Sequence, residues 1–197
     1  FIARGYAQPN AQGTEIVGPD VFQFSIVYGL RTLSSPTLSS NSICAGSNLT
    51  VSANEIGAFD TGNIFQAYLS DANGNFLNPI LVGNGTNPNS ITCSIPNYLP
   101  SSDNYKIMIR STAPVVSSLA SISNLSITSS NVTLTSPQND ILNLTKTEQA
   151  SQTLTAENKI SGTSNVLFKA GNHVLLNPGF SANTGTVFEA RVEDVCL

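Results

Sequence analysis

The sequence is poor in charge and in aromatic side chains. Charged residues make up 10% of its 197 positions, against about 25% in an average soluble domain, and tryptophan is absent. The formal net charge is -4, and the few Lys and Arg residues are scattered singly. Such a surface creates no field that gathers phosphate backbones or anionic lipid, so we expect no nucleic-acid partner.

Long apolar runs are missing as well. No stretch approaches the roughly 18 residues that span a bilayer, which predicts no membrane insertion. The chain opens with Phe1 and without the charged-then-apolar pattern of a secretory signal, so we expect a processed chain or a fragment.

Histidine occurs once, and this limits the chemistry available. A hydrolase needs a nucleophile with a neighbouring base, or a pair of carboxylates. His173 has no Asp or Glu close to it in the sequence, which favours a solvated turn residue over a metal ligand or a catalytic base. We expect no enzymatic activity and no cofactor.

Cysteine is scarce: Cys44, Cys93 and Cys196 stand far apart, without a Cys-x-x-Cys pair or a nearby histidine, which disfavours zinc. Cys44 precedes one predicted strand and Cys93 lies within another. A disulfide between these two is one interpretation, and buried thiols are the other. If they pair, Cys196 is left over and, in an oxidising compartment, needs another partner or a reason to stay reduced.

Helical periodicity is absent, and the pattern that remains is that of an all-β protein. Residues 35–129 contain seven strand-like segments, the count of an immunoglobulin-like β-sandwich. The segments are "SPTLSSNSIC", "NLTVSAN", "NIFQAYLS", "PILVGN", "SITCSIP", "NYKIMIRS" and "ASISNLSIT". Asn73-Gly74 after the third predicts a tight hairpin. Tyr105 in "SDNYKIMIR" lies where such folds have a tyrosine corner, so we expect its hydroxyl to bond backbone.

Residues 150–197 consist of short apolar steps separated by glycine corners. The expected corners are Gly162, Gly171, Gly179 and Gly185. Glycine turns sharply without Cβ strain, so this block predicts a small stacked-rung β-solenoid of about three rungs. The Ser/Thr/Asn-rich residues 130–149, "SNVTLTSPQNDILNLTKTEQ", are interpreted as a linker.

The same block also resembles a known family. "TLTAENKI", "AGNHVLLNPGF" and "GTVFEARV" are similar to the three-coathanger stack domain at the C-termini of secreted and surface proteins of the Bacteroidota. Members of that family often close with a cysteine shortly after the last strand, and Cys196 is similar. The preceding segment, with "SICAGSNLTVS" and "NYKIMIRS", resembles the immunoglobulin-like repeats of the same proteins. The resemblance implies an extracellular or cell-surface location and supplies no catalytic residues.

Residues 1–34 add one strand more than the sandwich needs. In "VFQFSIVYGL", every second residue falls on one side of a predicted strand. These residues are Phe22, Phe24, Ile26 and Tyr28. The segment is interpreted as an N-terminal arm with an extra edge strand, or as the tail of a truncated upstream domain. The alternative is a strand that completes the sheet of a neighbouring molecule.

Two weaker ligand hypotheses come from loops. Asp71, Asn73 and Asn75 have the oxygen spacing of a calcium loop without its closing glutamate, so turn chemistry is favoured over a metal site. Phe76 and Tyr98 lie at loop edges where a sugar-binding aromatic would stand, although core or corner packing is the simpler interpretation.

Together these patterns predict a non-catalytic extracellular structural protein. We expect it to be a surface or filament subunit, or the terminal part of a secreted adhesin, with a second copy or a neighbouring surface protein as partner. The alternative is a carbohydrate-binding or calcium-dependent adhesion module of a secreted enzyme.

Overall fold

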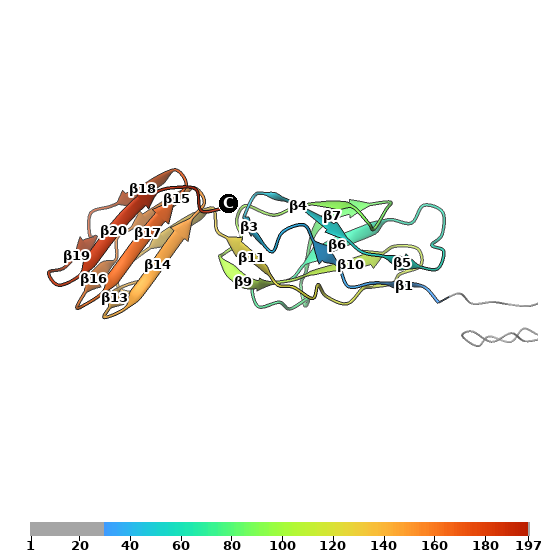
Figure 1. Cartoon of the computed structure of the whole chain (residues 1–197), viewed down its shortest axis with the longest axis horizontal. Coiled ribbons are helices and arrows are strands. Elements are labelled where there is room, and N and C mark those ends of the chain that lie inside the picture. The colour runs from blue at the N-terminus through green and yellow to red at the C-terminus, as the bar shows by residue number, and fades with distance from the viewer. Residues whose placement is uncertain (1–29, 197) are drawn as a thin grey trace, which may run out of the picture.

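The computed structural model describes residues 30–196, all of it strand, turn and loop. Two β regions follow one another along the long axis of the molecule, an N-terminal region of residues 32–128 and a C-terminal region of residues 131–192 (Figure 1). The described residues contain no helix, and so none long and apolar enough to cross a membrane.

The N-terminal region contains eleven strands among the described residues. They are β1 (Thr32–Leu33), β2 (Thr37–Leu38), β3 (Ser42–Cys44), β4 (Asn48–Ser52), β5 (Glu55–Ile56), β6 (Phe65–Leu69), β7 (Ile80–Gly85), β8 (Ile91–Ser94), β9 (Ser102–Tyr105), β10 (Ile107–Ser111) and β11 (Leu125–Thr128). A six-stranded sheet has the order β10-β6-β7-β8-β4-β2, a three-stranded sheet has the order β3-β11-β9, and β1 pairs with β5. Both larger sheets contribute to one core.

Alternating side chains build this core, as the sequence predicts. In β6, Phe65, Ala67 and Leu69 are buried while Gln66 and Tyr68 between them are half-buried. Every one of the seven predicted segments contains at least one strand. The boundary at residue 35 is wrong, because β1 lies before it and pairs with β5.

The predicted turn at Asn73-Gly74 forms, but it does not join β6 directly to β7 as a two-residue hairpin. β6 and β7 do pair antiparallel, but a longer loop, residues 70–79, connects them. Gly74 alone has a positive φ there, of 84°, while a two-residue turn of that type requires it at both central residues. Within that loop a turn is closed by the Gly74 amide, which donates to the Asp71 carbonyl at 3.1 Å, and by the Asp71 amide, which donates to the Asn75 carbonyl at 2.9 Å. The Asp71 carboxylate adds bonds from the amides of Asn73 and Asn75.

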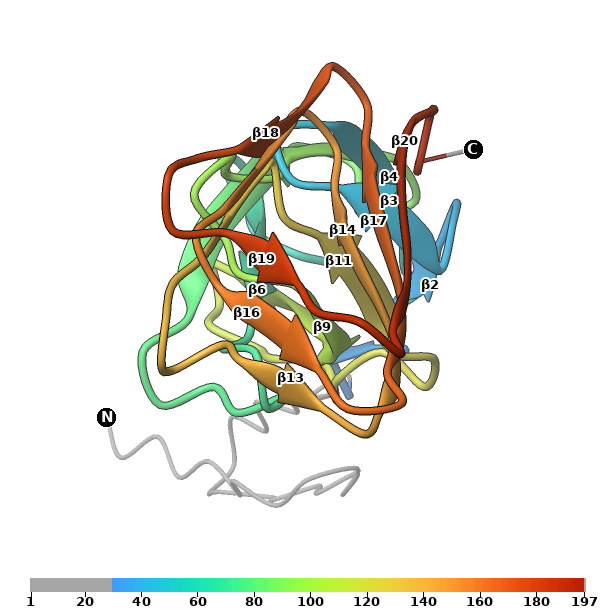
Figure 2. The same cartoon turned by 90° about the vertical axis from the view of Figure 1, so that its left-hand side faces the viewer.

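The C-terminal region contains nine strands. They are β12 (Asn131–Leu134), β13 (Ile141–Leu142), β14 (Thr145–Ala150), β15 (Thr153–Ala156), β16 (Lys159–Ser161), β17 (Asn165–Ala170), β18 (His173–Leu176), β19 (Ser181–Ala182) and β20 (Val187–Val192). They form three parallel sheets, ordered β12-β15-β18, β13-β16-β19 and β14-β17-β20. Each turn of the chain therefore adds one strand to each sheet, and we call such a set of three strands a rung. Seen along the axis, the strands of a rung form the sides of a coil (Figure 2), and buried side chains from the three sheets make up its core.

The linker predicted at residues 130–149 is wrong, because this segment is the first rung. β12, β13 and β14 pair in parallel with β15, β16 and β17. Only two residues separate β11 from β12, and the Ser130 hydroxyl donates to the Ala45 carbonyl at 3.1 Å. The segment is polar because few of its side chains, chiefly Leu134 and Ile141, enter the core.

The four predicted glycine corners all fall between strands of the second and third rungs. Gly162 has a φ of 69°, in the left-handed region where a Cβ is strained. Gly171 has no such angle, but a Cβ there would lie 2.1 Å from the Ser151 carbonyl oxygen of the rung below. Inside the rungs, Phe168, Phe180 and Phe188 pack their rings together, with centroids 5.0–6.2 Å apart.

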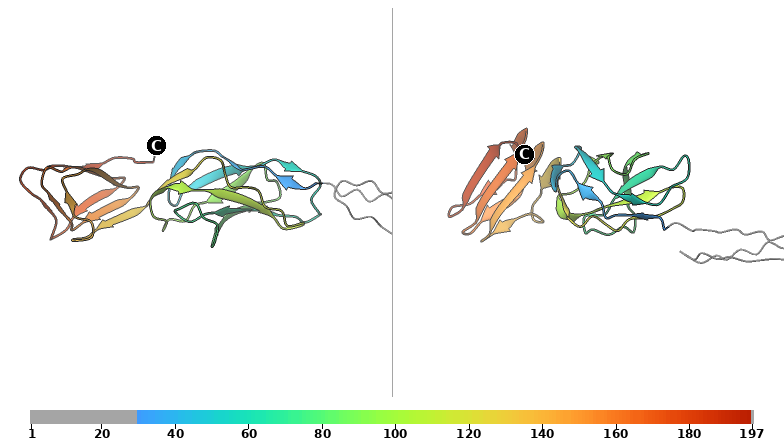
Figure 3. Two further views of the ribbon diagram at one scale, coloured as in Figure 1. Left: turned by 90° about the horizontal axis from the view of Figure 1, so that it is seen from below. Right: turned by 45° about the vertical axis from the view of Figure 1, so that its right-hand side comes forward.

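A disulfide joins Cys44 to Cys196, and it corrects the predicted Cys44–Cys93 pairing. The Cα atoms of Cys44 and Cys196 are 5.7 Å apart, within the usual range for a bridge. Cys93 is a free thiol buried in the N-terminal core, opposite Gly83 of β7. The C-terminus thus returns from the third rung to the N-terminal region, as two further views show (Figure 3).

Candidate functional site

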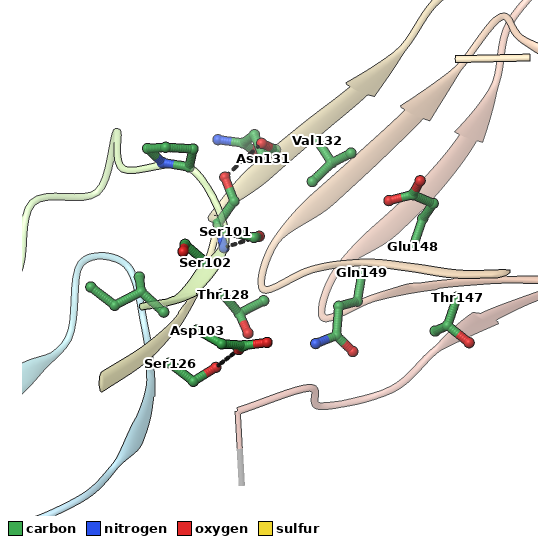
Figure 4. Close-up of a pocket in the computed structure, with 13 residues that line it drawn as sticks. Ser101, Ser102, Asp103, Ser126, Thr128, Asn131, Val132, Thr147, Glu148 and Gln149 are labelled. Atoms are coloured by element: carbon green, nitrogen blue, oxygen red, sulfur yellow. Dashed lines mark hydrogen bonds between the residues drawn. The ribbon is translucent and has the colours of Figure 1, made fainter. Parts of the chain in front are cut away.

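A groove of about 610 Å³ lies where the two regions meet (Figure 4). One wall comes from β9, β11 and the residues around them, and the other from the first rung. The lining residues are Pro100, Ser101, Ser102, Asp103, Ser126, Ile127, Thr128, Ser129, Asn131, Val132, Thr147, Glu148 and Gln149. Most of these side chains are hydroxyls or amides, which can donate and accept hydrogen bonds.

Both carboxylates of the groove already have partners. The Ser126 hydroxyl donates to Asp103 Oδ1 at 2.5 Å. Glu148 pairs with Lys146 at 2.5 Å, with side chains 20% and 46% exposed. Glu148 stands opposite the buried Phe168 in the register, so this ion pair occupies inward positions of the first rung. Charge therefore covers the groove end of the C-terminal core.

The opposite end of that core is apolar and exposed. The inward positions of the third rung, read from its register with buried residues of the second, are Val174, Leu176, Ala182, Phe188, Ala190 and Val192. Leu176 is 46% exposed and Val192 62% exposed, although Ala156 and Ala170 opposite them are fully buried. No further rung covers these side chains in the described part of the chain.

The third rung also presents one-sided strands. β18, β19 and β20 each have a neighbour in the second rung and none on the other side within residues 30–196. Strand edges of this kind are ready to pair with another chain unless they are blocked. An apolar face framed by three such edges is the strongest association feature of the described structure, and we call it the open end.

His173 begins β18 and lies exposed on the outside of the third rung, opposite Thr153. Among residues 30–196, no three His, Cys, Asp or Glu side chains cluster as metal ligands would. Within these residues, the His173 imidazole therefore belongs to no cluster of metal-ligating side chains.

The Asp71 carboxylate is engaged by its own loop. Oδ1 accepts from the amides of Asn73 and Asn75 at 2.9 and 2.8 Å, and Oδ2 accepts from the Asn75 side chain at 3.3 Å. These bonds hold the pKa of Asp71 below its ordinary value, and the bond from the Asn75 backbone amide contributes most. Acceptance of backbone N–H groups by an Asp side chain two and four residues upstream is the usual turn chemistry of this residue.

The two aromatic candidates do not share a platform. Tyr98 is 73% exposed, in the turn after β8, so the expectation of core or corner packing is wrong for it. Phe76 is half-buried in the loop between β6 and β7. No ring contact joins these two residues among the aromatic pairs of the described chain.

Tyr105 has the structural role that the sequence predicts. Its ring is 1% exposed, and its hydroxyl donates to the Pro100 carbonyl at 3.0 Å, five residues upstream. Burial, and secondarily the Asp71 charge, raise the pKa of Tyr105. The strand predicted around Phe22, Phe24, Ile26 and Tyr28 lies outside the described residues.

Sequence reasoning missed both the groove and the open end. Part of the signal for the open end was present, because "VFEARV" alternates in step with "NVLFKA" one turn earlier. The sequence did not show that the residues after Val192 run back to Cys44. No family model, curated protein or solved structure matches the chain.

Proposed function

We propose that this protein is a non-catalytic structural subunit of the cell exterior that works by holding on to other protein molecules. The observation that carries the proposal is the open end, whose apolar inward positions and one-sided strands have no cover within residues 30–196. Monomeric proteins rarely expose contiguous apolar patches larger than a few hundred Å², and larger patches commonly mark association sites.

The finer fold assignment belongs to the same proposal. The N-terminal region is an immunoglobulin-like sandwich, supported by the Tyr105–Pro100 hydrogen bond. The C-terminal region is a small β-solenoid of the three-coathanger type, supported by its three parallel sheets. Domains of both kinds serve as rigid spacers and docking surfaces in extended assemblies.

The disulfide supports an extracellular or surface location in this proposal. A bridge such as Cys44–Cys196 forms and persists in oxidising compartments and is rare in the reducing cytosol. The low charge and the absence of a basic field agree with protein partners over nucleic acid.

Strand addition is the second contact in this proposal. The alternating segment Phe22–Tyr28 adds as an edge strand to a neighbouring molecule, because main-chain pairing gives affinity and alternate side chains give register. This contact rests on the sequence pattern alone.

Sedimentation velocity of the full chain over a wide range of concentrations tests the proposal. The chain should form concentration-dependent assemblies, and deletion of residues 21–28 should remove those that depend on strand addition while both regions stay folded. A single monomeric species at every concentration, with or without this deletion, would contradict self-association.

The groove favours carbohydrate binding as a second candidate function. Its hydroxyl and amide lining suits sugar hydroxyls, and the exposed Tyr98 offers a ring outside the groove. Isothermal titration with glycans selected from an array should then show saturable binding that weakens in Gln149→Ala. A flat array removes this candidate and leaves the association proposal intact.

A further inference from the structure

We propose that two copies of the chain join end to end through their open ends, with β20 pairing antiparallel to β20 of the second copy and Ala190 on the two-fold axis. The inference deepens the proposed function, on which it rests, because it names the partner, the surface and the register of one contact. The interface is isologous, so each contact occurs twice.

The two ends of the C-terminal core differ in a way that identifies the surface. At the groove end, inward positions carry the Lys146–Glu148 ion pair, which tolerates water. At the open end, the equivalent positions in β20 carry Phe188 and Ala190. Solenoids need a polar outer face on a terminal rung to stay soluble, and the third rung lacks one. An apolar partner of matching shape supplies the missing cover.

The backbone of β20 is free to pair. The Val187 amide donates to the Ser164 carbonyl at 2.8 Å, and the Glu193 amide donates to the Ala170 carbonyl at 3.0 Å. Odd-numbered residues of β20 therefore direct their backbone groups toward the second rung. Successive residues alternate, so the residues that direct N–H and C=O outward are Phe188, Ala190 and Val192.

Charge on the outer face of β20 selects one register. Glu189 and Arg191 lie two positions apart on that face and pair within the chain at 2.5 and 2.9 Å. If Ala190 faces Ala190 of the second copy, then Glu189 of each chain faces Arg191 of the other. Opposite charges at such positions stabilise strand pairing, and like charges oppose it.

In the same register, the inward side chains of the two copies face each other, and so do their outward-directed backbone groups. Phe188 of one copy lies opposite Val192 of the other, so apolar side chains meet over the exposed cores. These are the residues with outward-directed backbone groups, so they form the hydrogen-bonded pairs. The register shifted by two residues would place Glu189 against Glu189, which the charges disfavour.

A second copy fits this end better than head-to-tail stacking. Head-to-tail growth would place the third rung of one chain on the first rung of another. That side of the first rung faces the groove and the N-terminal region, which the Cys44–Cys196 disulfide ties in place. Beyond Val192 the chain leaves toward the second rung, where Glu193 pairs with Lys169 at 2.6 Å, so the open end stays clear.

Charge reversal in the full chain tests the pairing. Glu189→Arg and Arg191→Glu each place like charges opposite one another twice in the homodimer, so each should raise the dimer dissociation constant by about tenfold or more. An equimolar mixture of the two variants should restore dimers at wild-type concentrations, because each then meets the opposite charge. Sedimentation equilibrium measures all three, and Glu148→Lys at the groove end is the matched control, with unchanged association.

The mixture separates a lost contact from a lost fold, since two misfolded variants would not rescue each other. Wild-type dimers that persist in both variants, or variants that fail to recombine, overturn the β20 pairing while leaving self-association intact. Dimers that disappear only on deletion of residues 21–28 assign the contact to the arm instead. A wild-type chain that is monomeric throughout overturns the inference and the self-association part of the proposed function together.

Discussion

Cys44 and Cys196 are 152 positions apart in the sequence, and their Cα atoms lie 5.7 Å apart. The bridge connects the end of β3 to the segment that follows the third rung, and so it closes a loop that contains nearly the whole described chain. The two regions otherwise meet through a two-residue connection and the walls of the polar groove. The disulfide therefore fixes how the C-terminal region is attached to the N-terminal one.

Removal of the disulfide should cost stability. Cys196→Ser should lower the free energy of unfolding by about 2 to 5 kcal/mol, because a bridge across so long a loop restricts the unfolded chain strongly. Urea unfolding under oxidising conditions measures the change. Reductant should lower the midpoint of the wild type and leave Cys196→Ser unaffected; equal midpoints for the wild type with and without reductant would contradict the bridge.

Loss of the Tyr105 hydroxyl should be costly in the same assay. Tyr105→Phe removes the hydrogen bond to the Pro100 carbonyl within a buried site and should destabilise by about 1 to 3 kcal/mol. Tyr68→Phe is the control, since that hydroxyl donates to Gln66 Oε1 on the half-buried face of the six-stranded sheet, whereas Tyr105 ends β9 of the three-stranded sheet. A Tyr105→Phe variant as stable as Tyr68→Phe would remove the structural role assigned to the corner.

Two glycines of β7 should respond differently to alanine. A Cβ at Gly83 would lie 2.5 Å from the Thr92 carbonyl oxygen and 3.1 Å from Cys93 Sγ, so Gly83→Ala should destabilise by about 1 to 3 kcal/mol. At Gly85 the nearest atom is 3.8 Å away, and Gly85→Ala should stay within about 0.5 kcal/mol of wild type. Thermal melts of both variants suffice, and equal melting temperatures would show that β7 and β8 separate without cost.

The Cys93 thiol should make the stability depend on pH in the alkaline range. Burial raises the pKa of the Cys93 thiol to about 12, well above the ordinary value near 8.5. Between these values the unfolded thiol loses its proton and the folded one keeps it, so stability should fall as the pH rises from about 9 toward 12.

Cys93→Ala isolates this contribution. The pKa of Tyr105 is also raised, but wild type and variant share that group, so the difference between their pH profiles reports Cys93 alone. Parallel profiles above pH 9 would mean that the thiol ionises freely in the folded chain. Slow alkylation of native Cys93, compared with the unfolded chain, gives an independent check.

The sequence was sufficient to predict those elements whose local pattern agrees with the burial of their side chains. Alternation in β6 follows from period-two patterning, and the role of Tyr105 follows from its place just before a predicted strand, where a tyrosine corner is expected. The corners at Gly162 and Gly179 follow from the φ that only glycine adopts easily.

The first rung escaped prediction for two physical reasons. The corner that Gly162 makes in the second rung is made in the first by Asn143, with a φ of 54° and its side-chain oxygen accepting from the Thr163 amide. Lys146 and Glu148 occupy inward positions, so the apolar alternation of β14 is interrupted. Both features belong to a rung that borders a polar groove. The sequence pattern of the rung does not show that it lies beside this groove.

The cysteine pairing could not be derived from the sequence for a similar reason. Cys44 and Cys93 both belong to predicted strand segments, which made their pairing one interpretation. In the structure Cys93 lies in β8, within the core, while Cys44 ends β3 at the side where the C-terminus returns. Which thiols meet depends on how the last residues after β20 run, and no local signal encodes that path.

The short segment from Val192 to Cys196 also limits the number of rungs that the C-terminal region can contain. Each extra rung would move the last strand outward by about 4.8 Å, whereas an extended residue spans only about 3.3 Å. A longer relative could therefore keep its closing cysteine bonded only by adding about two residues to this tether for every rung gained. Tether length and rung number are thus expected to change together as such chains diverge.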